Sequence, residues 1–164
     1  MATMRRWNKI SAIVNYEELT PTEFRARLAD APIAYLPLGT LEWHGEHLPL
    51  GSDGIQSRGF FVELAHQVGG IVVPMLFLGP DSSKSLTGDE FYGMDINSFR
   101  DENPEQLPGS AYWVSDDLFE HILSATLKQL SRAGFRIVVA HGHGPSTTIF
   151  QKHIVYWEQL HGLE

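Results

Sequence analysis

Residues 36–53 read LPLGTLEWHGEHLPLGSD, and this stretch concentrates side chains that bind metal ions or protons. The short apolar run at 33–38 leads into it and ends at a glycine, which predicts a buried strand closed by a turn. Carboxylates and imidazoles in such a mixture suit Zn²⁺, Mn²⁺ or Fe²⁺. They are Glu42, His44, Glu46, His47 and Asp53. Composition alone leaves open a plain polar loop whose histidines face solvent.

A second histidine segment follows another predicted strand. Residues 135–140 are β-branched and apolar, and they lead directly into His141 and His143. Ligand sites in open α/β sheets lie beyond the carboxyl ends of the strands. We therefore expect both histidine segments on the same side of the sheet.

Helical signals separate the predicted strands. Thr20 precedes a proline, and Glu23 completes a capping box, so a helix is predicted to start there. A second helix is predicted over 53–68, where apolar residues recur at helical spacing, namely Phe60, Phe61, Leu64 and Val68. Further helices are predicted over 115–133 and 145–160. Another strand is predicted over 71–78. Continuous apolar strands that alternate with helices predict an α/β fold, a three-layer α/β/α arrangement with a mostly parallel sheet.

Two further features of this pattern concern the predicted site. Asp53 falls at the start of a predicted helix, where the macrodipole favours a carboxylate, and a capping aspartate can also be a metal ligand. Residues 79–113 form a long polar, acidic stretch, which is too long for a routine connection. We interpret it as a functional lid, an interaction arm, a disordered segment or an insertion.

Composition limits the classes of partner. The chain has 164 residues, which predicts a single domain, and a formal charge of −8, which argues against nucleic-acid binding. It contains no cysteine, so disulfides and thiolate metal sites are excluded, and a cytoplasmic location is expected. We see no apolar run of membrane-spanning length and expect no membrane partner.

The motif at 42–49, EWHGEHLP, resembles the first metal motif of the creatininase (creatinine amidohydrolase) family, and Asp53 follows at the distance seen in that family. The segment HGHG at 141–144 resembles the Asn-Gly-His-Gly or Asn-Gly-His-Tyr motif at the end of a later strand in family members. The resemblance runs more loosely from about residue 20 to the C-terminus.

The resemblance implies roles for individual residues. Glu42 and His143 would ligate one metal ion, His44 would ligate the other, and Asp53 would bridge both. His47 would have an outer or substrate-facing role. His141 stands where the family usually has Asn, and it is either an additional ligand or a residue bonded to the backbone. The implied cofactor is Zn or Mn, with Fe as a further option.

The resemblance also implies an activity, hydrolysis of a C–N bond in a small cyclic amide or a formamide, and a homo-oligomeric protein. Pro145 departs from it, because creatininase itself has a metal-binding Glu there and many relatives use a later Glu that this chain does not reach. We therefore expect residues 1–164 to be a single creatininase-like domain that is incomplete at its C-terminus. A catalytically incomplete relative that retains partial metal binding, or a small-ligand binding module, are the alternatives.

Overall fold

The computed structural model describes residues 11–97 and 105–164. Its strands are β1 (Ile33–Leu38), β2 (Ile71–Val72), β3 (Ser83–Leu86), β4 (Asp89–Tyr92) and β5 (Ile137–Gly142). Its helices are the short 3-10 turn η2 (Tyr16–Glu18), α1 (Pro21–Asp30), α2 (Ser52–Val68), α3 (Met94–Asn97), α4 (Asp116–Ala133) and α5 (Gly144–His161).

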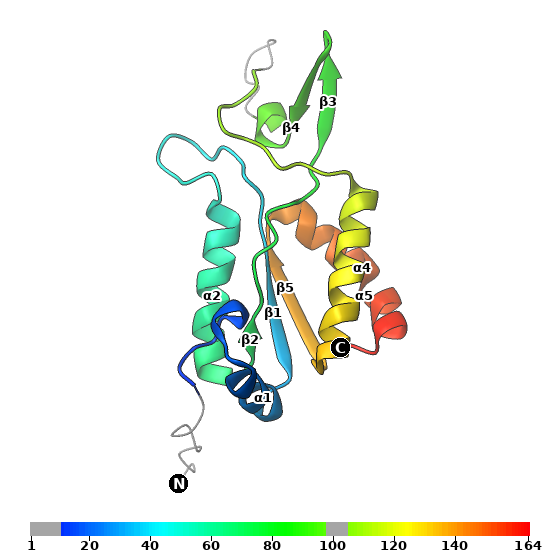
Figure 1. The fold of residues 1–164 in the computed structure, drawn as a ribbon. Helices are drawn as coiled ribbons and strands as arrows, with labels where there is room; N and C mark the ends of the chain where they lie inside the picture. The colour runs from blue at the N-terminus through cyan, green and yellow to red at the C-terminus, as the bar shows by residue number, and fades with distance from the viewer. Residues whose placement is uncertain (1–10, 98–104) are drawn as a thin grey trace.

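A parallel sheet forms the centre of the described part of the chain, with the strand order β2-β1-β5 (Figure 1). Strand β1 pairs in parallel with β5 along its whole length, from Ile33 opposite Ile137 to Leu38 opposite Gly142. It pairs with β2 only at Ala34 and Tyr35. Because β1 and β5 end side by side, the loops that follow them lie at one edge of the sheet.

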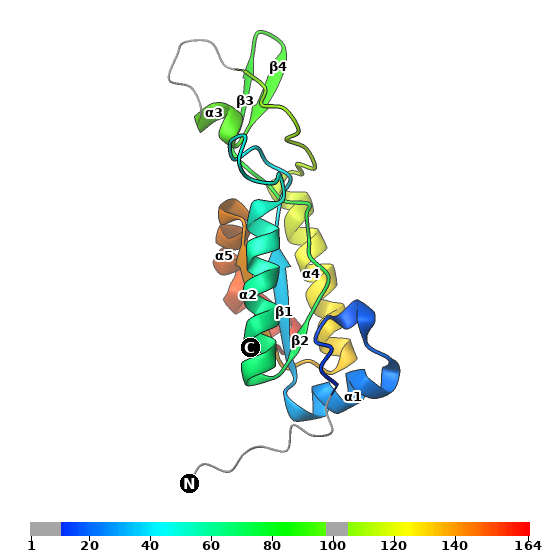
Figure 2. The same cartoon turned by 90° about the vertical axis from the view of Figure 1, so that its left-hand side faces the viewer.

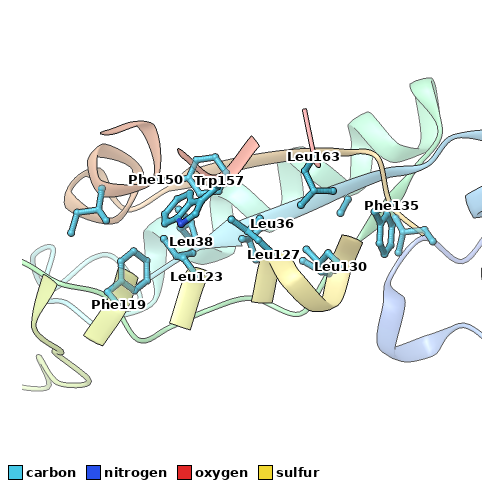
Figure 3. Packing of buried hydrophobic residues seen from close by; sticks show 14 residues of the cluster. Leu36, Leu38, Phe119, Leu123, Leu127, Leu130, Phe135, Phe150, Trp157 and Leu163 are labelled. Atoms are coloured by element: carbon cyan, nitrogen blue, oxygen red, sulfur yellow. The ribbon is translucent and has the colours of Figure 1, made fainter. Parts of the chain in front are cut away.

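Helices cover the two faces of this sheet (Figure 2). Leu36 and Leu38 of β1 belong to a core cluster with residues of α4 and α5, several of which Figure 3 labels. Tyr35 belongs to a second cluster with residues of α2, and its ring centroid lies 5.3 Å from that of Phe61. Alternate residues of a strand point to opposite faces, so α2 and the α4–α5 pair form separate layers. The predicted three-layer α/β/α class is confirmed.

The start of α1 matches its sequence signals. The Thr20 side chain accepts a hydrogen bond from the Glu23 backbone, and the Glu23 side chain accepts one from the backbone of Thr20, which completes the predicted capping box. The Ser115 side chain caps α4 by accepting a hydrogen bond from the Leu118 N–H at 3.3 Å. Gly134 ends α4 with φ at +102°, a backbone conformation that favours glycine.

Two expectations about the strands and helices are wrong. The strand predicted over 71–78 is regular only at Ile71–Val72. Pro74 has no N–H to donate to a ladder, and the chain pairs with β1 again through a bridge between Leu76 and Leu38. In α2, the four apolar residues at helical spacing do not share one buried face, because Phe61 is buried whereas Phe60 and Val68 are exposed. Besides Phe61, the buried face of α2 consists of small residues such as Ser57 and Ala65.

The stretch 79–113 carries structure of its own that its polar composition does not indicate. Strands β3 and β4 form an antiparallel hairpin, and α3 follows directly; residues 98–104 lie outside the described residues. The hairpin stands beyond the ends of β1 and β5, on the same side as the loop after β1 (Figure 1). None of the helices in the described ranges is long and apolar enough to cross a bilayer.

Candidate metal centre

The loop between β1 and α2 carries two of the four predicted ligands, Glu42 and His44, and backbone hydrogen bonds hold it in place. The Glu42 N–H donates to the Leu50 carbonyl at 2.8 Å, which closes the loop on itself. From the far end of the 79–113 stretch, the Ala111 N–H donates to the Leu41 carbonyl at 2.9 Å. The residues around Glu42 are therefore fixed by a segment distant in sequence.

Glu42, His44 and Asp53 form one group of converging side chains, in which one ligand atom from each residue lies within 4.8 Å of the others. His44 Nε2 is 3.7 Å from Glu42 Oε2 and 3.5 Å from Asp53 Oδ1. The other ring nitrogen, His44 Nδ1, is 3.0 Å from the backbone carbonyl of Glu42 and would donate to it as N–H. That tautomer leaves Nε2 free to bind an ion.

His143 lies opposite this group and reaches the same carboxylate. It directly follows β5, and its N–H donates to the Leu38 carbonyl at 2.9 Å, which holds it against the end of β1. Its Nε2 lies 3.9 Å from Glu42 Oε2 and 3.2 Å from Asp81 Oδ2. Its Nδ1 lies 2.9 Å from Ser146 Oγ, and both side chains are buried. Glu42, Asp81 and His143 form a second group with ligand atoms within 4.8 Å.

Glu42 belongs to both groups, and its surroundings are unusual for a carboxylate. Only 5% of the residue is exposed, and the backbone N–H of Met94 donates to Oε1 at 2.9 Å. Burial raises the pKa of Glu42 and the charge of Asp81 raises it further, while the bond from Met94 and the two histidines lower it. A buried carboxylate that faces a second one is stabilised in its charged form by a cation.

The separations fit divalent ions. Two atoms bonded to one ion at about 2.0–2.2 Å lie roughly 3–3.6 Å apart at tetrahedral or octahedral angles. The nitrogen–oxygen distances in the two groups run from 3.2 to 3.9 Å, so small side-chain movements would close either group around an ion. The mixture of imidazole and carboxylate ligands favours zinc, manganese or iron over magnesium and calcium.

The remaining predicted residues lie apart from these groups. His47 and His141 are exposed, and neither belongs to either group. The backbone carbonyl of His141 accepts a hydrogen bond from Ser57 Oγ at 2.5 Å. The structure thus brings together Glu42, His44, Asp53 and His143 and leaves both other histidines at the surface.

Asp81 is the residue that the sequence reasoning missed. It lies in the polar 79–113 stretch, which has many acidic residues and no metal motif, so its own sequence context does not distinguish it. One signal was available: Asp81 follows the Gly79-Pro80 turn after the second apolar run, at the edge of the sheet where ligands collect.

Fold and site together define a three-layer α/β protein with a candidate centre for divalent metal ions where two parallel strands end. A family model for creatininase, described as creatinine amidohydrolase, matches residues 17–155. The chain belongs to the creatininase family.

Individual relatives cover the chain to different extents. A creatinine amidohydrolase from Pseudomonas putida is 36% identical over 78 residues, which are 46% of this chain and 30% of the relative. A crystal structure of creatinine amidohydrolase (creatininase) has a TM-score of 0.70 and 24% identity, over 92% of this chain and 52% of that one. A manganese creatininase structure has a TM-score of 0.68 and 24% identity, over 92% of this chain and 55% of that one. At this identity the structural likeness establishes the fold, and the chain spans about half the length of these solved creatininases.

Proposed function

We propose that this chain carries the metal centre of a metal-dependent amidohydrolase, which hydrolyses a C–N bond in a small cyclic amide or a formamide. The observation that carries the proposal is the convergence of Glu42, His44, Asp53 and His143 where β1 and β5 end. The names of the relatives support the reaction class, since they are creatinine amidohydrolases. A mutant creatininase of the Zn–Zn type and a manganese creatininase support zinc or manganese, with iron as a further option.

The side chains of the centre would hold the metal ions. A bound divalent ion supplies a water that is a better nucleophile at neutral pH and polarises the carbonyl of the substrate. Glu42 and His143 are proposed as ligands of one ion and His44 as a ligand of the other, with Asp53 as the bridging carboxylate. Asp53 lies in the first turn of α2, where the helix dipole stabilises its charge. His47 and His141, both exposed, are left for outer or substrate-facing roles.

A catalytically incomplete relative is the second candidate, and a specific observation favours it. Pro145 lies in the first turn of α5 beside His143, and its side chain offers no ligand atom. The chain also spans about half the length of the solved creatininases, so their whole activity does not transfer to it by likeness alone. In this case metal binding would remain while turnover would be absent.

One experiment separates the two candidates. The full chain, purified without chelator, is assayed for hydrolysis of creatinine and for formate release from a small formamide, before and after metal removal. Turnover that disappears with the metal and returns with Zn²⁺ or Mn²⁺ supports the amidohydrolase. Bound metal without turnover supports the incomplete relative, and failure to bind metal overturns both. His143→Ala should abolish turnover, whereas the exposed His66→Ala should not.

We further propose that the protein is a cytoplasmic homo-oligomer. The support for self-association is a row of exposed apolar side chains on α5, namely Val155, Tyr156 and Leu160, which are 65%, 58% and 53% exposed. Exposed apolar surface of this kind commonly marks protein–protein contacts. Light scattering at micromolar concentration should give a mass above 18.4 kDa, and a Tyr156→Lys variant should lower it. A stable monomer would contradict this proposal.

A further inference from the structure

The buried ring of His143 has a hydrogen-bonding neighbour at each nitrogen, Ser146 Oγ at 2.9 Å from Nδ1 and Asp81 Oδ2 at 3.2 Å from Nε2. The ring nitrogen Nδ1 lies against the hydroxyl of Ser146, a residue with no exposed surface. When Nδ1 carries the proton and donates to Ser146, Nε2 presents a lone pair. That lone pair faces two carboxylate oxygens, Asp81 Oδ2 at 3.2 Å and Glu42 Oε2 at 3.9 Å.

Each of the two carboxylates is held by a backbone N–H through one oxygen and presents the other to His143. Asp81 Oδ1 accepts from the Ser82 N–H at 2.6 Å, which leaves Oδ2 toward the ring. Glu42 Oε1 accepts from the Met94 N–H at 2.9 Å, which leaves Oε2 toward the ring. Both side chains are therefore oriented by the backbone rather than by each other.

The backbone at Gly93 comes close to both carboxylates. Its φ is +51°, and a Cβ added there would lie 2.6 Å from Asp81 Oδ2 and would overlap Glu42 Oε1. The glycine thus allows the turn between β4 and α3 to close over the two oxygens. The imidazole of His143 and the two oriented carboxylates thus form a compact group, with ligand atoms within 4.8 Å of one another.

We propose that Asp81 is a metal ligand, which joins Glu42, His143 and the bridging Asp53 as the fourth protein ligand of one ion. The segment after β2 then supplies a carboxylate to the centre. This inference rests on the proposed function, because it assumes that the centre binds a divalent ion. It adds a ligand that lies outside both histidine-bearing segments, in the short segment that leads into the β3–β4 hairpin.

The first test compares zinc and manganese binding to the wild-type chain, Asp81→Asn and the matched control Ser82→Ala, by titration against a chelating indicator. Ser82 is exposed, and its contact to Asp81 uses the backbone, which the control keeps. Loss of an outer-sphere partner typically costs about 10–100-fold in metal affinity, so loss of a direct ligand should cost at least about 100-fold at one site. Wild-type affinity in Asp81→Asn would overturn the inference while leaving the proposed function standing. A wild-type chain that binds no metal would overturn both.

A second test distinguishes coordination from positioning. The chain contains no cysteine, so a single Asp81→Cys variant provides the one thiolate, a ligand that soft ions select. Loaded with Cd²⁺, this variant should show the ultraviolet charge-transfer band of a cadmium–thiolate bond, and Ser82→Cys should not. Cadmium bound to Asp81→Cys at the wild-type stoichiometry without that band would show that residue 81 does not touch the ion.

Discussion

The backbone N–H of Met94 donates a 2.9 Å hydrogen bond to Oε1 of Glu42, a side chain from a distant loop. This bond joins the segment after the β3–β4 hairpin to the loop after β1. It fixes Oε1 and leaves Oε2 toward His44 and His143, at 3.7 and 3.9 Å. One backbone donor thereby orients the carboxylate that is common to both candidate ligand groups.

Glu42→Gln should remove most of the bound metal. The amide is nearly the same size, but it carries no charge to attract a cation and compensate the burial of the site. Elemental analysis after gel filtration measures the effect. Glu46→Gln is the matched control, because Glu46 lies in the same loop, is exposed and belongs to neither group. Equal metal content in both variants would contradict the assignment of Glu42.

Asp53→Ala should reduce metal content more than His47→Ala. Asp53 Oδ1 lies 3.5 Å from His44 Nε2, and a carboxylate that bridges two ions contacts both when they bind. His47 is exposed and outside both groups, so its loss should leave the stoichiometry unchanged. The two variants are compared by elemental analysis at equal protein concentration. A larger loss in His47→Ala would mean that the ligand set is wrong.

Gly93→Ala should weaken metal binding beyond its effect on folding. The added methyl group would displace the carboxylates of Glu42 and Asp81. Gly88→Ala is the control, since Gly88 also has a positive φ, of +95°, but nothing lies within 4 Å of its added Cβ. The left-handed backbone should cost either variant about 1–2 kcal/mol. Urea unfolding measures the loss of stability, and metal titration measures the loss of metal affinity. Equal metal affinities in Gly93→Ala and Gly88→Ala would contradict the close approach of Gly93 to the two carboxylates.

The capping box of α1 should make stability depend on pH. Hydrogen bonds from the Thr20 side chain and backbone lower the pKa of Glu23 in the folded protein. A carboxyl with a lowered folded pKa contributes stability above its unfolded pKa, and this contribution is lost as the pH falls through the folded value. Urea unfolding from pH 7 to pH 3 should therefore show a smaller acid loss in Glu23→Gln than in the wild type. Parallel curves for the two proteins would be inconsistent with this linkage.

Local signals were sufficient for much of the fold. The capping box at Thr20 and Glu23 depends on neighbours within one turn and appears as predicted. The helix predicted over 115–133 is also present, with Ser115 as its cap. Strand β1 was bounded by Pro32 and Gly39, which mark its ends directly. The extent of β2 depends on pairing with β1, which the apolar composition of 71–78 does not encode.

Some residues of the candidate site could likewise be predicted from the sequence, and others could not. Glu42, His44 and Asp53 lie within twelve residues of one another in the sequence. His143 follows a strand that pairs with β1, so the convergence of these residues was predictable. Asp81 lies at the centre because the chain after β2 passes beside His143, a contact between segments far apart in the sequence. The sequence left His141 open as an additional ligand or a residue bonded to the backbone, and its side chain is exposed where β5 ends.

The most direct test of this account is the metal content of the full chain, expressed and purified without chelator. We expect bound zinc or manganese in stoichiometric amount. The melting temperature should fall when a chelator removes the metal and recover when the metal is restored. His143→Ala should purify with less metal. A folded wild-type chain that contains no metal, and whose melting temperature does not change when Zn²⁺ or Mn²⁺ is added, would contradict the central claim.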